Sequence, residues 1–347
     1  MSKVNAKDAI AMGIYHFHPR WTIHNGDSIE KRIEEFETVM KSGYFNSIIV
    51  EVTYLNNDEF WRVIFENDAV VWLNIYDYFV SEKEDYDTWF KGFVEPLKTL
   101  KANKERWDRF QGFHFDEPVW RGQKNKDFLE MTKNLYETYN KRIYPVFATG
   151  EFTQSEGNQL QLQISGDQMR KVIPSSLKYV TDVGFDSYSV DIREGAPNPG
   201  VIERAHAEFP EVVDGKSYYR VLCDNLKKVV GHDVNIWLYP CAYTTSLWGG
   251  LNGQGRADEE YCLAHLEFFR ELLLSQEFKG GIDLYTYKNS IAKPEEQGLV
   301  SFLDVKNENG EQYLFPEIPK WEKYSKRLRE ICEEFRNTNA NHSKYKA

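Results

Sequence analysis

Two adjacent carboxylates, Asp116 and Glu117, follow an alternating aromatic run and precede a proline in the stretch GFHFDEPVW. Paired carboxylates suit general acid and base chemistry, in which one group must hold its proton near neutral pH. Apolar surroundings of the kind that Phe113, Phe115 and Trp120 supply raise the pKa of a carboxyl group. Glu117 has the longer reach, so we predict that it is the acid and base in cleavage of a glycosidic bond.

A structural role is the alternative for this pair. Acidic residues just before a helix are favoured by the helix dipole, so Asp116 would cap a following helix and Glu117 would be solvated. Pro118 suits both interpretations, because proline is common in the first turn of a helix.

The elements that must position the pair follow a repeated pattern. Eight short β-rich runs recur, and the segments between them carry apolar residues at helical spacing. This alternation predicts an α/β fold, a single-domain (β/α)8 TIM barrel with extended βα loops, over residues 1–336. The expected strands are residues 10–17, 47–52, 70–76, 110–115, 143–148, 180–188, 235–240 and 281–287. The polar residues 337–347 are predicted to form a disordered tail.

The expected helices are residues 28–42, 126–140, 217–231, 258–275 and 319–336. Ser28 is predicted to cap the first of them and Gly231 to end the third. Long connections at residues 150–166 and 191–215 follow the carboxyl ends of strands, where barrel loops build active sites. A doubly wound sheet is the competing architecture, but the sequence has neither a G-x-G-x-x-G motif after the first strand nor a P-loop motif.

Length and charge exclude several classes of protein. The 347 residues suit one barrel, and the formal net charge of -11 disfavours binding to nucleic acid or to anionic membranes. No apolar run of signal-peptide or membrane-span length is present, which predicts a cytoplasmic location unless a leader has been removed. The 4 cysteines lack C-x-x-C spacing and are predicted to be reduced, buried thiols.

Aromatic residues make up 15% of the chain, with 9 Trp and 21 Tyr. Their apolar faces and polar edges suit stacking against sugar rings, although an aromatic-rich core is the alternative. We therefore predict an oligosaccharide or glycoconjugate as the substrate.

Further candidate residues share a position near the carboxyl ends of the expected strands or in the loops that follow them. The predicted substrate-binding residues are His16, His18, Arg20, Trp21, Glu51, Asp77, Trp120, Asp186, Tyr188, Tyr243, Trp248 and Tyr287. His16 and His18 share a strand face, which permits metal binding, but no third ligand is evident, so we predict sugar contacts and neither metal nor cofactor. Tyr188 or Tyr243 is a candidate hydrogen-bond donor to the substrate, and Trp248 a stacking platform on a glycine-rich loop. For each tyrosine, packing under a loop is the alternative.

The FDEP stretch, residues 115–118, is similar to the motif that ends the fourth strand in glycoside hydrolase family 123 and related barrels. It also resembles the adjacent Asp-Glu pair of the family 20 β-N-acetylhexosaminidases. The resemblance implies that Asp116 orients and polarises the 2-acetamido group of the substrate, which attacks the anomeric carbon to give an oxazolinium intermediate. Glu117 is then the acid and afterwards the base.

This mechanism explains why YPCAYTT, residues 239–245 at the expected end of strand seven, has no carboxylate, because the substrate supplies its own nucleophile. The histidine-glycine context that precedes the pair in family 20 is absent from this sequence.

Other functions stay open on the sequence alone. Glu117 could act as the acid of an inverting or other retaining glycosidase, with Glu51, Asp77 or Asp186 as its partner. Glu51 and Asp77 have a simpler alternative role, which is to pair with Arg20 or another cation. A barrel that binds a saccharide without catalysis is a further alternative, and an aldolase would use Lys288 as its strand-end lysine.

Overall fold

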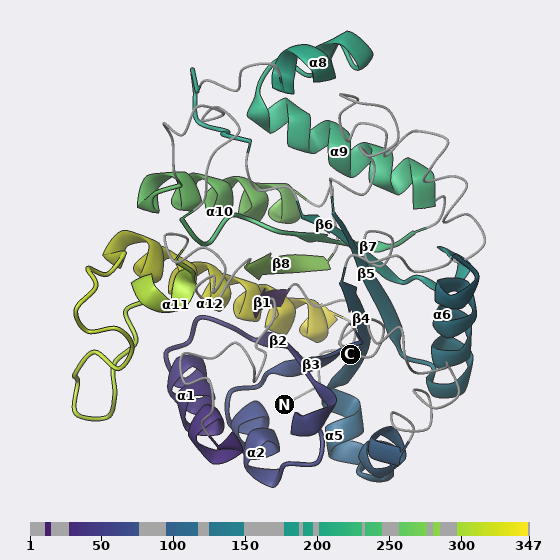
Figure 1. Ribbon diagram of the computed structural model, residues 1–347, viewed down its shortest axis with the longest axis vertical. Helices are drawn as coiled ribbons and strands as arrows, with labels where there is room; N and C mark the ends of the chain where they lie inside the picture. The colour runs from purple at the N-terminus through teal and green to yellow at the C-terminus, as the bar shows by residue number, and fades with distance from the viewer. Residues whose placement is uncertain are drawn as a thin grey trace. The chain divides into compact units, whose positions relative to one another are not determined.

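The computed structural model is a closed barrel of eight strands, each beside the next along the chain, with β8 beside β1. The strands are β1 (Ala11–Ile14), β2 (Ser47–Val50), β3 (Val70–Asn74), β4 (Phe110–Asp116), β5 (Arg142–Ala148), β6 (Asp182–Asp186), β7 (Asn235–Leu238) and β8 (Gly280–Leu284). Each expected run contains all of one of these strands or all but one of its residues, so the predicted (β/α)8 barrel is confirmed (Figure 1).

The structure describes residues 11–14, 28–75, 95–116, 125–148, 177–186, 190–196, 201–230, 233–244, 257–275, 280–284 and 297–345. The helices within these ranges are α1 (Ile29–Lys41), α2 (Asp58–Glu66), α5 (Lys104–Arg109), α6 (Asn125–Tyr139), α8 (Val201–Glu208), α9 (Gly215–Val230), α10 (Glu259–Leu274), α11 (Leu299–Phe302) and α12 (Glu322–Tyr345), with short 3-10 turns η3 (Val52–Tyr54) and η6 (Leu177–Tyr179). The expected helices correspond to α1, α6, α9, α10 and α12. The sequence analysis did not anticipate α2, α5, α8 or α11, and α8 lies inside the connection predicted at residues 191–215.

Helix starts follow the expected chemistry in most cases. The side chain of Asp258 accepts a hydrogen bond from the Tyr261 backbone N at 2.8 Å, and Asn57 accepts one from Phe60 N at 3.0 Å. These oxygens cap α10 and α2 by satisfying backbone donors that the first turn leaves free. Ser28 occupies the N-cap position of α1 as predicted, but its side chain makes no capping hydrogen bond there.

The end of the chain differs from the prediction. Helix α12 continues to Tyr345, so residues 337–345, for which the sequence predicted disorder, are helical. Extending a formed helix by one residue costs little compared with nucleating one, so a polar segment can continue an amphipathic helix. The Thr338 hydroxyl donates to the Glu334 carbonyl at 2.9 Å within this extension.

The chain divides into two compact units, the first built from residues 1–114 and 281–347 and the second from residues 115–280. In the first unit, alternate strand residues form a continuous apolar face. They are Met12, Ile14, Ile48, Val50, Leu73, Ile282 and Leu284, all buried. Helix α1 buries Ile33 and Phe36, and α12 contacts β1. This apolar face therefore packs against helices, and the opposite face of each strand lines the barrel.

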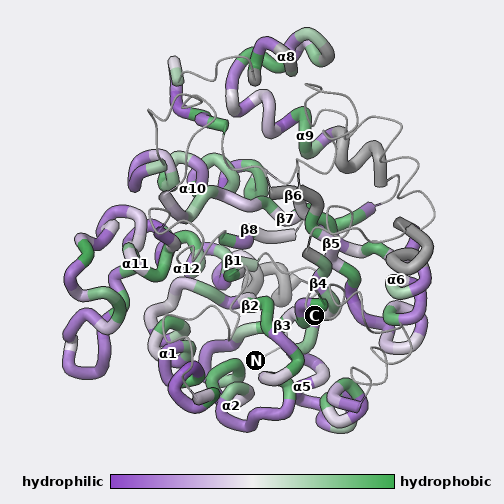
Figure 2. The backbone as a smooth tube through the Cα atoms, viewed as in Figure 1, coloured by the Kyte–Doolittle hydropathy of each residue, from purple (hydrophilic) through white to green (hydrophobic). Residues whose placement is uncertain are grey.

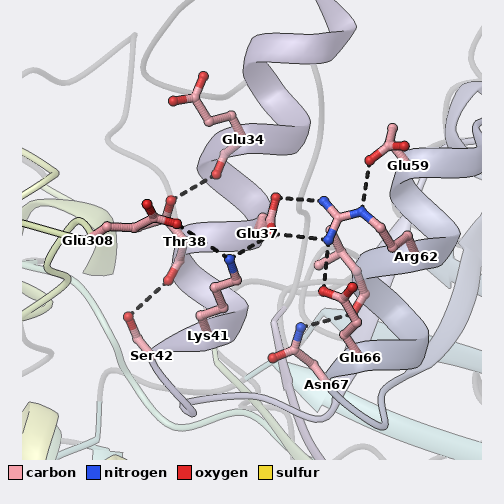
Figure 3. A network of polar contacts seen from close by, with 11 residues as sticks. Glu34, Glu37, Thr38, Lys41, Ser42, Glu59, Arg62, Glu66, Asn67 and Glu308 are labelled. Carbon is pink, nitrogen blue, oxygen red and sulfur yellow. Dashed lines mark hydrogen bonds and ion pairs between the residues drawn. The ribbon is translucent and has the colours of Figure 1, made fainter.

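Helices α1 and α2 of the first unit lie side by side and are joined by Arg62 (Figure 3). The Arg62 guanidinium donates to both carboxylate oxygens of Glu37, at 2.8 and 3.1 Å, and also to Glu59 and Glu66 on its own helix. Hydrogen bonds from Arg62, and then from Lys41, lower the pKa of Glu37 to about 2. This network links the outer surfaces of α1 and α2 to each other.

The connection between α11 and α12 is hydrophilic at its tip, residues 306–312 (Figure 2). Its backbone is held by side chains, because Lys320 Nζ donates to the carbonyls of Ser301, Leu314 and Phe315 at 2.7 to 2.8 Å. Gln312 Nε2 donates to the Val305 carbonyl at 2.8 Å. These bonds satisfy carbonyl groups that no strand or helix would satisfy.

The second unit contains β5, β6 and β7 with helices α6, α8, α9 and α10. Its apolar strand face includes Ile143, Val183, Ile236 and Leu238, which are buried. The other face of the same strands carries polar and aromatic residues, and these line the barrel. In both units an aliphatic outer face of the sheet lies opposite an inner face that carries polar and aromatic side chains.

All 4 cysteines are free and buried, which confirms the prediction of reduced thiols. Across the part of the chain that the structure covers, no helix has the length and apolar character of a membrane span.

Candidate active site

Asp116 is the last residue of β4, at the carboxyl end of the fourth barrel strand. This end of the strands is where barrel enzymes carry their catalytic groups. Glu117, the next residue along the chain, lies outside the described residues, as does the side chain of Asp116. The position of Asp116 at the end of β4 is therefore established, and the catalytic role of the pair stays a prediction.

Most of the predicted substrate-binding residues lie outside the described residues: His16, His18, Arg20, Trp21, Asp77, Trp120, Tyr188, Trp248 and Tyr287. Asp186 is the last residue of β6, as expected for a group at a strand end. Glu51 and Tyr243 are described with their side chains.

Glu51 directly follows β2, and its backbone carbonyl accepts from Tyr54 N at 3.2 Å to begin η3. Burial raises the pKa of the Tyr54 hydroxyl, while Arg32 opposes this shift and Glu51 and Glu35 add to it. Arg32 and Glu51 thus both act on the Tyr54 hydroxyl. The pairing of Glu51 with a cation and its contact with substrate both stay predictions.

A buried polar pair, His114 and Asn74, lies on the inner face of β4 and β3. The two residues are register partners, and His114 Nδ1 lies 3.3 Å from Asn74 Oδ1. Burial lowers the pKa of His114 to about 3, so the imidazole is neutral. An amide oxygen only accepts, so Nδ1 carries the proton and Nε2 carries the lone pair. His114 stands two residues before Asp116 in the same strand.

His114 and Asn74 were not among the residues predicted from the sequence. A usable signal was present, because Asn74 interrupts the apolar run VVWLNIY and His114 interrupts an aromatic one. Residues two apart in a strand share a face, so counting in twos from Asp116 would have placed His114 on the lining face.

A second buried polar side chain, Asp283 of β8, reaches across β1. A Cβ atom at Gly13 would lie 1.7 Å from Asp283 Oδ1, so an alanine there would force the Asp283 carboxylate to move. Gly13 and Asp283 are register partners, so the absence of a side chain in β1 makes room for the carboxylate. Sequence reasoning missed this contact too.

In the second unit, the inner face is aromatic. The hydroxyl groups of Tyr144 and Tyr239 are hydrogen-bonded to each other, and the Tyr144 ring stacks on Trp237 with centroids 4.9 Å apart. A Cβ atom at Gly184 would lie 2.7 Å from Tyr239 Cε2, so glycine leaves room for the tyrosine ring. All three aromatic side chains are buried.

At the opposite, amino-terminal end of β5 and β6, Arg142 and Asp182 form a buried ion pair. Arg142 Nε donates to Asp182 Oδ2 at 2.8 Å and Nη2 donates to Oδ1. Trp237 Nε1 also donates to Asp182 Oδ1, at 2.9 Å. This end of a barrel serves stability rather than catalysis, so we assign the Arg142–Asp182 pair a role in stabilising β5 and β6.

Tyr243, five residues past the end of β7, is 8% exposed. Its backbone carbonyl accepts from the Cys241 and Cys262 thiols at 3.2 and 3.9 Å. The near-complete burial agrees with the packing alternative for this residue, and its contact with substrate stays a prediction. No group of three or more potential metal ligands occurs among the residues with described positions.

No protein-family model matches the sequence, and a search of curated proteins found no match. Similar solved structures include β-glucuronidase from Ruminococcus gnavus with a C6-substituted uronic isofagomine, at TM-score 0.54 and 13% identity over 92% of this chain and 50% of that one. The same protein with D-glucuronic acid gives a TM-score of 0.54 at 12% identity, over 94% and 49% of the two chains. The complex of the same protein with uronic deoxynojirimycin gives a TM-score of 0.53 at 13% identity, over 92% of this chain and 50% of that one.

The chain therefore spans about half the length of these structures. At such low sequence identity the likeness shows the fold, a barrel of the same kind.

Proposed function

We propose that this chain is a glycoside hydrolase that cleaves β-N-acetylhexosaminide linkages, with Glu117 as acid and base and Asp116 orienting the 2-acetamido group. The observation that carries the proposal is that Asp116 ends β4 of a closed eight-strand barrel and Glu117 follows it directly. Two adjacent carboxylates at this position match the requirements of substrate-assisted hydrolysis.

In the proposed reaction, the acetamido oxygen attacks the anomeric carbon while Glu117 protonates the leaving oxygen. The resulting oxazolinium ring carries positive charge at nitrogen, which the Asp116 carboxylate balances. Glu117, now ionised, takes a proton from the water that opens the ring. The enzyme returns to its starting state and the product retains its anomeric configuration.

A raised pKa for the acid is part of the proposal. The second unit, to which both carboxylates belong, has buried aromatic side chains along its inner face, among them Tyr144, Trp237 and Tyr239. Apolar neighbours disfavour the charged form of a carboxyl group, so a Glu117 side chain packed among such residues would keep its proton near neutral pH.

An inverting glycosidase is the second candidate, and the position of Asp186 favours it. Asp186 ends β6 within the same unit as the catalytic pair, so it is a candidate base for activating water. Glu51 and Asp77 are the other candidates. The similar R. gnavus structures are complexes of a β-glucuronidase with D-glucuronic acid and with a C6-substituted uronic isofagomine, so a β-glucuronide is a further substrate class to test. A barrel that only binds saccharides would cleave none of these compounds.

The deciding experiment is a panel of chromogenic β-glycosides with and without a 2-acetamido group, including a glucuronide, with the product anomer followed by NMR. We expect cleavage of the acetamido sugars with retention. We also expect Glu117→Gln to lower turnover at least about a hundredfold, the usual scale of general acid catalysis, with the fold intact by circular dichroism. The exposed Glu105→Gln in α5 is the matched control and should retain activity.

Asp116→Asn separates the two glycosidase candidates. If Asp116 balances charge on the oxazolinium ring, the variant should lose turnover more than binding, and a thiazoline analogue of the ring should inhibit the wild type more tightly than the parent sugar does. Efficient cleavage of glucosides or glucuronides without thiazoline inhibition would refute the substrate-assisted mechanism. Near-normal activity of Glu117→Gln on an unactivated substrate would refute the assignment of the acid.

A further inference from the structure

Two buried thiols in the second unit share one hydrogen-bond acceptor. Cys241 follows β7 and Cys262 lies in the first turns of α10, and both are fully buried. Their sulfur atoms donate to the Tyr243 carbonyl oxygen at 3.2 and 3.9 Å. Two sulfur atoms that donate to the same oxygen atom are neighbours in space.

We propose that Cys241 and Cys262 form a disulfide when the protein is oxidised. This bond would link the two ends of the connection between β7 and α10. Residues 242–261 lie between the two cysteines, so the bond would close a loop that begins and ends in packed structure.

Both anchor points are well held, which favours formation of the bond in the folded protein. Asp258 caps α10 through Tyr261 N at 2.8 Å, so the helix start that carries Cys262 is defined. On the other side, Tyr239 and Ala242 flank Cys241 and are buried. A disulfide needs its two Cα atoms within about 7 Å, and the shared acceptor brings the two thiols into the same small region.

Metal binding is the competing use of two neighbouring thiols. His265 lies one turn after Cys262, but its Nε2 is hydrogen-bonded to the Val190 carbonyl at 3.0 Å. Over the residues whose positions the structure gives, no set of three metal ligands is found. The geometry therefore favours thiol oxidation.

The oxidation balances with a diazene oxidant such as diamide. The two S–H bonds break and one S–S bond forms, while the two protons and the two electrons released reduce the N=N bond to a hydrazine. The Tyr243 carbonyl then loses these two thiol donors. Burial raises the pKa of Cys262, so the thiolate is scarce and oxidation should be slow and should accelerate as the pH rises.

The test is oxidation of the native, full-length chain with diamide, followed by alkylation with N-ethylmaleimide in denaturant and mass spectrometry. We expect two alkylated cysteines instead of 4 and a peptide in which Cys241 and Cys262 are joined. The melting temperature should rise by a few degrees, because the bond restricts the unfolded chain, and dithiothreitol should reverse the change. None of these measurements depends on any enzymatic activity.

Matched variants assign the bond. Cys241→Ser and Cys262→Ser should each keep three alkylated thiols after diamide, whereas Cys332→Ser, on α12, should still form the disulfide. The proposal is overturned if the native wild type keeps 4 alkylated thiols after prolonged oxidation at pH 8.5, if the bond forms only in urea, or if it joins a different pair.

Discussion

Asp182 provides the most direct test of how the inner face of the second unit is held together. Its carboxylate is fully buried and accepts hydrogen bonds from Arg142, from Trp237 Nε1 at 2.9 Å and from Thr181 Oγ1 at 2.7 Å. The change Asp182→Asn keeps the shape and one oxygen but removes the charge. The Arg142 guanidinium, 8% exposed, is then buried beside a neutral amide whose NH2 group faces it.

Removing one partner of a buried ion pair costs about 3–5 kcal/mol, because the remaining charge is desolvated without compensation. Whole domains have unfolding free energies of only about 5–15 kcal/mol, so this loss should be large and easily measured. We expect Asp182→Asn to lower the free energy of unfolding by roughly 3 kcal/mol, since the asparagine oxygen still accepts one hydrogen bond.

Urea unfolding followed by circular dichroism measures the loss. Asp58→Asn is the matched control: Asp58 pairs with Arg106, but its side chain is 87% exposed, so its loss should stay under about 1 kcal/mol. The double variant Arg142→Met, Asp182→Leu removes both charges and should recover a substantial part of the stability. The reasoning is refuted if Asp182→Asn loses no more than Asp58→Asn, or if the double variant is less stable than the single one.

Three further predictions concern other parts of the chain. Gly13→Ala should destabilise the protein, because the new Cβ would lie 1.7 Å from Asp283 Oδ1 and would displace this buried carboxylate; thermal unfolding measures the loss, and adding Asp283→Ala should recover part of it. Burial lowers the pKa of His265 to about 4 from its usual 6.5, so the unfolded state binds a proton that the folded state refuses, and stability should fall as the pH drops from about 6.5 to 4. His265→Gln should flatten this dependence in urea unfolding at several pH values, and an unchanged profile would contradict the assignment. Glycosidase activity should survive EDTA; activity lost to EDTA and restored by a divalent ion would instead make His16 and His18 candidate ligands.

The sequence determined the barrel because its signals are local. Strands such as NIWLYP and helices such as the one after Asp258 are encoded in the spacing of apolar residues within one short segment. Counting these segments was sufficient to place Asp116 at the end of the fourth strand. Signals at element ends were weaker, since α12 runs past the predicted boundary and Ser28 makes no capping hydrogen bond.

The tertiary structure alone decided which distant residues meet. The His114 ring lies against the Asn74 side chain, and the Asp283 carboxylate fills the space beside Gly13. The Cys241 and Cys262 thiols share one acceptor. The two residues of each pair are at least twenty positions apart in the sequence. These contacts depend on the register of adjacent strands and on how a helix packs against the strand before it. If the pairing register of a strand shifts by one residue, every side chain of that strand turns to the other face of the sheet. The residue pattern within one segment does not specify its register with the neighbouring strand.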